Sequence, residues 1–261
     1  MELFSKITDW VKQLKIYSDN VGTDINYEEY KILVLGDKSV GKTSICNRFC
    51  QNEFSLEVKP STAYECYLKI VKLIDDYIKL YIIDTTENIL TTNRKEIYAD
   101  VKGALIVYDL TKTSTFENID KWILDIKQGI NSNLPIMLIG HKSDLIYLRN
   151  IDIEEGEDKA KKCDIGFMET SCLDEFSIDN AVKMLVAKIY YNDMPENKKN
   201  YLKMSLIKQL EKQDATISDD NNNNNNNNNI NNVNDNNSSN NTNNINNIDN
   251  ESKAENNIQN N

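Results

Sequence analysis

The sequence is poor in the residues from which zinc sites and disulfide frameworks are built. It has one histidine, His141, and five cysteines, no two of which form a CxxC pair. Structural zinc sites need four cysteine or histidine ligands, most of them in close pairs, so none is expected here. The cysteines are therefore predicted to be reduced thiols, as in a cytosolic protein.

Positive charge and long apolar runs are also scarce. The 41 acidic residues outnumber the 30 lysines and arginines, which gives a formal net charge of −11. Because nucleic acids attract basic surfaces, they are not expected as partners. No apolar run approaches the length of a membrane-spanning helix, about 20 residues. The start of the chain lacks the apolar centre of a signal peptide, so we expect a soluble cytoplasmic protein.

The two ends of the chain differ in composition from its middle. Residues 215–261 are mostly asparagine, with nine in a row at 221–229, and are predicted to be disordered. Residues 193–214 combine lysines with spaced apolar residues and are expected to form a solvated, partly helical linker. Residues 1–29 form an N-terminal extension, in which residues 3–14 carry an apolar stripe at helical spacing. Such a stripe either packs on protein or makes a peripheral membrane contact, and the sequence leaves both open.

Strand-like and helix-like segments alternate through the central region, residues 30–192. The runs "YKILVLG", "GALIVYDLT" and "LPIMLIG" are apolar, as expected of strands buried on both faces. The segments "YLKIVKLI" and "YIKLYIID" flank Asp75 and Asp76 and are predicted to form a hairpin. The segment "TFENIDKWILDIKQGI" has helical spacing, with Ser114 or Thr115 as its expected N-cap. The pattern predicts an α/β fold, a doubly wound and mostly parallel sheet with one antiparallel edge strand, flanked by helices.

One motif in this region carries specific chemistry. The stretch "GDKSVGKT" matches the phosphate-binding loop GxxxxGK[ST] without mismatch, and it lies between an expected strand and an expected helix. Its glycines let the backbone wrap a phosphate chain, toward which backbone amides and the helix dipole point. Lys42 would bridge the β- and γ-phosphates, and the Thr43 hydroxyl would bind Mg²⁺. The residues expected to contact the nucleotide here are Gly36, Asp37, Lys38, Ser39, Val40, Gly41, Lys42, Thr43 and Ser44.

With this loop and the segments "YDLTKTSTFENIDKWILDI", "GHKSDL" and "METSCLD", the chain resembles the small GTPases of the Ras superfamily, and the Rab family most closely. The resemblance covers Tyr30 to Tyr191 and implies a P-loop NTPase G domain that binds GTP or GDP with Mg²⁺. It implies metal contacts from Thr43, Asp84 and a hydroxyl of either Ser61 or Thr62. It also implies that effector and exchange-factor proteins bind residues 58–66 and 84–98.

The resemblance assigns recognition of the guanine base to a further set of residues. They are Phe54, His141, Lys142, Asp144, Ser171 and Cys172. Asp144 would accept the N1 and N2 protons, which selects guanine over adenine, while Lys142 would lie over the ring and Ser171 would meet O6. His141 stands where the family usually has asparagine. A neutral imidazole keeps one donor and one acceptor, so both contact with N7 and the absence of any ligand role stay open.

The stretch "IDTTEN" departs most from the family, whose members read Asp-x-x-Gly-Gln-Glu. Asp84 is kept, but either Glu87 and Asn88 replace the glycine and glutamine, or the glycine is deleted and Glu87 replaces the glutamine. Both alignments remove an amide–phosphate bond of about 1.5–3 kcal/mol. A carboxylate about 5 Å from the γ-phosphate adds repulsion of about 3 kcal/mol at an effective dielectric near 20. The sequence therefore predicts slow GTP hydrolysis and a weak response to the γ-phosphate.

Three functions remain open at this stage. The first is an atypical Rab-like GTPase in vesicle and membrane traffic, a role that rests on the resemblance alone. The second is a pseudo-GTPase scaffold that does not switch with nucleotide. The third is an ATP-dependent P-loop kinase, which Asp144 and the hairpin before Asp84 disfavour. Rab proteins usually end in prenylated cysteines, and no cysteine follows Cys172, so no prenyl anchor is expected and any endomembrane location would be peripheral.

Overall fold

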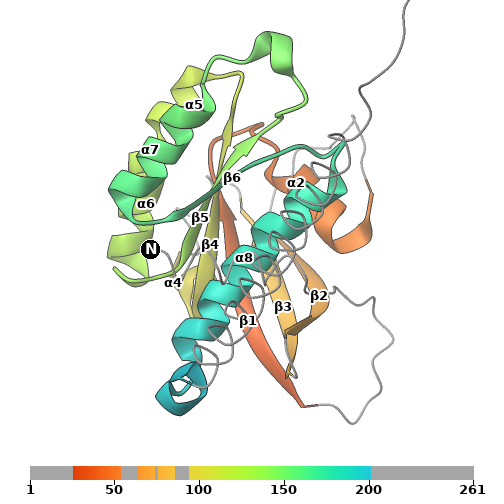
Figure 1. The fold of residues 1–261 in the computed structure, drawn as a ribbon, viewed down its shortest axis with the longest axis vertical. Coiled ribbons are helices and arrows are strands. Elements are labelled where there is room, and N and C mark those ends of the chain that lie inside the picture. The colour runs from red at the N-terminus through yellow and green to blue at the C-terminus, as the bar shows by residue number, and fades with distance from the viewer. Residues whose placement is uncertain (1–25, 54–63, 74–75, 86–93, 201–261) are drawn as a thin grey trace, which may run out of the picture. The chain divides into compact units, whose positions relative to one another are not determined.

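The computed structural model of the chain describes residues 26–53, 64–73, 76–85 and 94–200 (Figure 1). The chain divides into two units, Met1–Pro195 and Glu196–Asn261, and only residues 196–200 of the second are described. The predicted apolar stripe at residues 3–14 and the asparagine-rich tail lie outside the described residues.

A six-stranded sheet forms the centre of the first unit, with the strand order β2-β3-β1-β4-β5-β6. The strands β3, β1, β4, β5 and β6 pair in parallel, whereas β2 runs antiparallel to β3 at one edge. The predicted fold class and hairpin are thereby confirmed. The strands are β1 (Tyr27–Leu35), β2 (Glu65–Leu73), β3 (Asp76–Asp84), β4 (Val101–Asp109), β5 (Ile136–His141) and β6 (Gly166–Thr170).

Helices cover both faces of this sheet (Figure 1). They are α2 (Lys42–Gln51), α4 (Arg94–Tyr98), α5 (Thr113–Glu117), α6 (Ile119–Gly129), α7 (Ile153–Cys163) and α8 (Glu175–Asp193), with one 3₁₀ turn at Ile146–Leu148. The helix α8 packs so tightly on one face that a Cβ added at Gly103 of β4 would lie 2.6 Å from Cδ1 of Ile189. On the other face, Ile97 of α4, Trp122 of α6 and Ala160 of α7 belong to one buried cluster.

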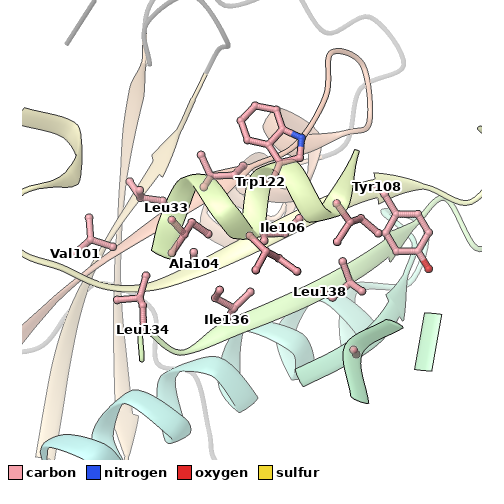
Figure 2. Packing of buried hydrophobic residues seen from close by; sticks show 14 of the residues in the cluster. Leu33, Val101, Ala104, Ile106, Tyr108, Trp122, Leu134, Ile136 and Leu138 are labelled. Carbon is pink, nitrogen blue, oxygen red and sulfur yellow. The ribbon is translucent and has the colours of Figure 1, made fainter. Parts of the chain in front are cut away.

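The helices on both faces explain why the central strands are apolar throughout. In β4 every residue except Lys102 is buried, and all six residues of β5 are buried. Figure 2 shows Trp122 of α6 on the same side of the sheet as Ala104 and Ile106 of β4 and Leu138 of β5. Strands covered by helices on both faces have no solvent side, so their sequences show no alternation of polar and apolar residues. This packing fixes the carboxyl ends of β1, β3, β4, β5 and β6 at one edge.

The helical segment after β4 differs from its prediction. The sequence favours one helix capped by Ser114 or Thr115, but the structure has two, with α5 beginning at Thr113 and α6 at Ile119. The Thr115 hydroxyl does not cap a helix, because it accepts a hydrogen bond from the Asp109 amide at 3.0 Å and donates one to the Lys112 carbonyl at 2.8 Å. The predicted apolar face of α6 is confirmed, since its apolar residues other than Leu124 are buried.

No helix in the described part of the chain combines the length and apolarity needed to cross a bilayer. All five cysteines are free thiols.

Replacing Ile106 by alanine is expected to lower the free energy of unfolding by about 2–5 kcal/mol, because the side chain is fully buried and its removal leaves a cavity. The matched control is Ile146→Ala, since Ile146 is 69% exposed and should change stability by less than about 0.5 kcal/mol. Urea unfolding should show a lower midpoint for Ile106→Ala at an unchanged slope. Equal midpoints for the two variants would contradict this account of the core.

Candidate functional site

The loop between β1 and α2 needs glycine at two positions. Gly36 has φ +141°, and a Cβ there would lie 2.2 Å from the Val107 carbonyl oxygen of β4. Gly41 has φ +107°, and a Cβ there would lie 2.4 Å from Cδ2 of His141. Both positions combine a left-handed backbone with a close approach, so no other residue fits without a rearrangement. Gly41 caps α2 without any side-chain hydrogen bond.

Lys42 opens α2 and folds back over the loop. Its Nζ donates to the carbonyl oxygens of Gly36 at 2.8 Å and Asp37 at 2.7 Å. These two acceptors hold the ammonium group above the start of the helix, where backbone amides and the helix dipole favour an anion. Lys38 and Ser39 are exposed beside it, while Val40 is buried beneath the loop. The arrangement is a positively polarised loop that suits a phosphate chain.

Thr43 and Asp84 meet at one side of this loop. The Thr43 hydroxyl donates to Oδ2 of Asp84 at 2.5 Å, and the Asp84 side chain is almost fully buried. Burial raises the pKa of Asp84, although the hydrogen bond from Thr43 and the charge of Lys42 oppose the shift. Its other oxygen, Oδ1, is buried and has no hydrogen-bond partner among the described residues. A buried carboxylate oxygen left open beside a hydroxyl fits Mg²⁺, which prefers oxygen ligands and retains water.

A second set of side chains lies at the carboxyl end of β5. Lys142 has φ +68°, and its Nζ donates to the Ser39 carbonyl at 3.0 Å and to Oδ2 of Asp109 at 2.7 Å. Asp109 is fully buried at the end of β4. Burial alone would raise its pKa, but the hydrogen bonds from Lys142 and Thr111 outweigh burial and hold the pKa of Asp109 below its usual range. Lys142 therefore joins β5 to both β4 and the phosphate loop.

Asp144 and Ser171 form the rim of the site. The Ser171 hydroxyl donates to Oδ1 of Asp144 at 2.6 Å and accepts from the Leu173 amide at 3.0 Å. Asp144 is exposed, while Ser171 is buried at the end of β6. A carboxylate held in place by a buried hydroxyl can accept hydrogen bonds from a ligand without first losing much conformational freedom.

His141 lies between the phosphate loop and this rim. Its Nδ1 is 2.9 Å from Oγ1 of Thr170, and its Nε2 is 3.4 Å from Sγ of Cys172. Burial, with a contribution from the charge of Lys142, lowers the pKa of His141 to about 4. The ring is therefore neutral at physiological pH. Its contact with the phosphate loop is van der Waals packing against Gly41.

Comparison with known proteins agrees with this geometry. A family model described as Ras family matches residues 31–191. The chain belongs to the Ras family. It is similar to Ras-related protein Rab-11A of Dictyostelium discoideum, with 34% identity over 62% of this chain and 76% of the relative. It is also similar to Ras-related protein Rab2BV of Beta vulgaris, with 36% identity over the same shares of the two chains. These relatives make it a Rab-like small GTPase.

The structure of this Ras-family chain places most of the predicted site residues along one edge of the sheet. The phosphate loop follows β1, Asp84 ends β3, His141 ends β5, and Ser171 follows β6. Side-chain contacts link neighbouring members of the set, from Thr43 with Asp84 to Ser171 with Asp144. Five other predicted or alternative residues lie outside the described residues, namely Phe54, Ser61, Thr62, Glu87 and Asn88.

One supporting residue, Asp109, was missed by the sequence analysis, and the supporting role of another, Asp37, was not foreseen. Asp109 binds Lys142, and its only sequence signal is its position at the end of a buried strand, in "VYDLT". Asp37 was predicted among the residues that contact the nucleotide, and in the structure its carboxylate accepts hydrogen bonds from Nδ2 of Asn118 at 2.7 Å and Nε1 of Trp122 at 2.9 Å. These bonds fix the loop to α6, and no local sequence pattern pairs residues so distant.

Because of His141, the free energy of unfolding should depend on pH between about 4 and 6.5. Its pKa falls from about 6.5 in the unfolded chain to about 4 in the folded one, so the unfolded chain binds the proton more readily. The resulting stabilisation is fully present above pH 6.5 and is lost as the pH falls toward 4, by about 3 kcal/mol. Because this is the only histidine, His141→Asn should remove that component, as the difference between the two unfolding curves at each pH would show. Parallel pH profiles for the two proteins would contradict the assignment.

Proposed function

We propose that this chain binds guanine nucleotide with Mg²⁺ and hydrolyses GTP slowly, as an atypical Rab-like switch in membrane traffic. The observation that carries the proposal is the position of Lys142. This residue connects the phosphate loop at Ser39 with the strand that leads to Asp144, so a phosphate end and a base end belong to one site. Ligands of doubly wound sheets bind at this carboxyl edge.

In the phosphate loop, the ammonium group of Lys42 is held by hydrogen-bond acceptors that are weaker than a phosphate oxygen. Lys42 donates to two backbone carbonyls, which are neutral acceptors. A phosphate oxygen carries charge, so transfer of the ammonium group from these carbonyls to the β- and γ-phosphates strengthens its hydrogen bonds. The amides at the start of α2 add to the same positive end. We infer that the loop is already shaped for phosphate.

Thr43 and Asp84 are the residues that would hold Mg²⁺, together with Ser61 or Thr62. When bound, Mg²⁺ neutralises charge on the β- and γ-phosphates. The Thr43 hydroxyl, which now donates to Asp84, would serve as a ligand, and Asp84 would hold water of the metal through its open Oδ1. Burial of Asp84 keeps this carboxylate away from solvent that would compete for it.

At the base end, Asp144 supplies the acceptor that discriminates guanine from adenine. Guanine presents N1–H and N2–H donors on one edge, and adenine does not present that pair. The stem of Lys142 would lie over the ring, and the amide of Cys172 would meet O6, because the single Ser171 hydroxyl proton is already donated to Asp144. The hydrogen bond from Ser171 supports the proposal because it fixes the Asp144 carboxylate before any ligand arrives. A site built for these donors penalises bases that lack them.

The slow hydrolysis in this proposal rests on Glu87 and Asn88 rather than on any described contact. The family's glutamine is missing after Asp84, and Glu87 puts a carboxylate in place of either the glycine or the glutamine. Effectors and exchange factors would bind residues 58–66 and 84–98, as in relatives of the Rab group. The traffic role follows from that kinship alone.

A pseudo-GTPase scaffold is the second candidate, because the same missing glycine removes the amide that senses the γ-phosphate. The two functions differ in the nucleotide that accompanies the purified protein. Retained GTP supports a switch locked in its active state, retained GDP supports a conventional cycle, and the absence of nucleotide supports the scaffold. Extraction and chromatography of the bound nucleotide, followed by affinities for GDP and GTP, separates the three.

Replacing Asp144 by asparagine is expected to weaken GDP binding by about tenfold to a hundredfold, since hydrogen bonds to a charged acceptor contribute about 1.5–3 kcal/mol. Binding of xanthosine diphosphate should improve, because the asparagine amide can donate to its C2 oxygen. Asp120→Asn is the matched control, as Asp120 is an exposed carboxylate paired with Lys159 on another surface. Titration calorimetry with both nucleotides measures the change. Equal GDP affinities in the two variants would remove Asp144 from the site.

Single-turnover GTP hydrolysis by the wild-type chain is expected to be slower than roughly 10⁻⁴ s⁻¹, below the intrinsic rate of small GTPases that have the glutamine. The double variant Glu87→Gly with Asn88→Gln should raise that rate by about tenfold, since it removes a repulsive carboxylate and restores a residue that orients water. The variant Asn88→Gln alone serves as the control that retains the carboxylate. A wild-type rate in the ordinary range would defeat the prediction.

A further inference from the structure

Both nitrogens of the His141 ring are already committed within the protein. Nδ1 lies 2.9 Å from the Thr170 hydroxyl and Nε2 lies 3.4 Å from the Cys172 thiol. His141, Thr170 and Cys172 are all at least 95% buried, so water does not compete for these contacts. Burial also raises the pKa of Cys172 to about 11, which keeps its thiol protonated.

The chemistry of the ring leaves no spare N–H in either tautomer. A neutral imidazole has one N–H and one acceptor nitrogen. If Nδ1 carries the proton, it donates to Thr170 and the Cys172 thiol donates to Nε2. If Nε2 carries it, the proton points to the sulfur and the Thr170 hydroxyl donates to Nδ1. The two neighbours can satisfy both forms because a hydroxyl and a thiol each donate and accept.

The ring edge nearest the phosphate loop is formed by Cδ2 and Nε2. A Cβ added at Gly41 would lie 2.4 Å from Cδ2 of His141 and 2.8 Å from its Nε2. An asparagine side chain has a polar atom on each branch of its amide. The imidazole has Nδ1 on one branch, paired with Thr170, and Cδ2–H followed by Nε2, paired with Cys172, on the other.

The remaining polar side chains at this end are also engaged. The Ser171 hydroxyl donates to Asp144, and Nζ of Lys142 donates to the Ser39 carbonyl and to Asp109. Guanine N7 is an acceptor and therefore needs a donor. Among the described side chains around His141, the Ser171 hydroxyl has no further proton to donate, and Nζ of Lys142 is held by two bonds that direct it to the Ser39 carbonyl and Asp109, with one N–H left.

We propose that this chain binds guanine without a hydrogen bond to N7. In this proposal His141 is a positioning residue that packs Gly41 against the loop after β5, which contains Lys142 and Asp144. The inference rests on the proposed nucleotide binding and specifies how the base is read. Recognition then depends on the N1–H and N2–H donors of guanine at Asp144, while the contact between His141 and Cys172 joins the end of β5 to the loop after β6. The chain should accept guanine nucleotides altered at position 7.

The test compares GDP with 7-deaza-GDP, in which a C–H replaces N7, on the full-length protein in the presence of Mg²⁺. The two dissociation constants of the wild-type chain are expected to agree within about twofold. In His141→Asn the amide N–H can donate to N7, so 7-deaza-GDP should bind about threefold to tenfold more weakly than GDP, the range of one neutral hydrogen bond. Asp144→Asn should weaken both ligands equally and leave their ratio unchanged.

The ratio of affinities is the decisive readout, because a loss of folded protein lowers both values together. A wild-type preference for GDP greater than about threefold would overturn the inference, as would His141→Asn with a ratio still near one. If the wild-type protein binds neither ligand, the proposed nucleotide binding fails and this inference fails with it. If it binds GDP well and 7-deaza-GDP poorly, only the reading of N7 fails.

Discussion

The site depends on one ion pair, between the partly exposed Lys142 and the fully buried Asp109. Asp109 is fully buried at the end of β4, and Lys142 is the cation that neutralises it from the end of β5. Removing one partner of such a pair leaves an uncompensated charge in the interior, at a cost of about 3–5 kcal/mol. The same ammonium group also donates to the Ser39 carbonyl, so a single side chain links the phosphate loop to the loop after β5.

The parts of this arrangement that follow a local pattern could be predicted from the sequence. The phosphate loop has a fixed spacing, and the glycines at positions 36 and 41 are required by backbone angles that the structure confirms. The buried strands were recognisable because helices cover both faces of the sheet. Contacts between distant segments could not be predicted. Asp37 is 81 residues from Asn118, and only the packing of α6 on the sheet brings their side chains within 2.7 Å.

The described side chains also show that the polar groups of the site satisfy one another. Lys42 uses carbonyls of its own loop, Thr43 uses Asp84, and Ser171 uses Asp144. Each of these bonds involves a group that the proposed ligand would contact. A nucleotide would therefore replace internal hydrogen bonds, and at Lys42 the gain would come from exchanging neutral carbonyl acceptors for charged phosphate oxygens. Asp84 Oδ1 is the exception, since it has no described partner to exchange.

The proposed function has two parts, nucleotide binding and switching. Binding would draw on the phosphate loop, Asp84, Lys142 and Asp144, all of which are described residues. Switching would draw on the stretch after Asp84, where the sequence has Glu87 and Asn88. His141, where the family usually has asparagine, lies on the binding side, and its ring contacts the Cys172 thiol.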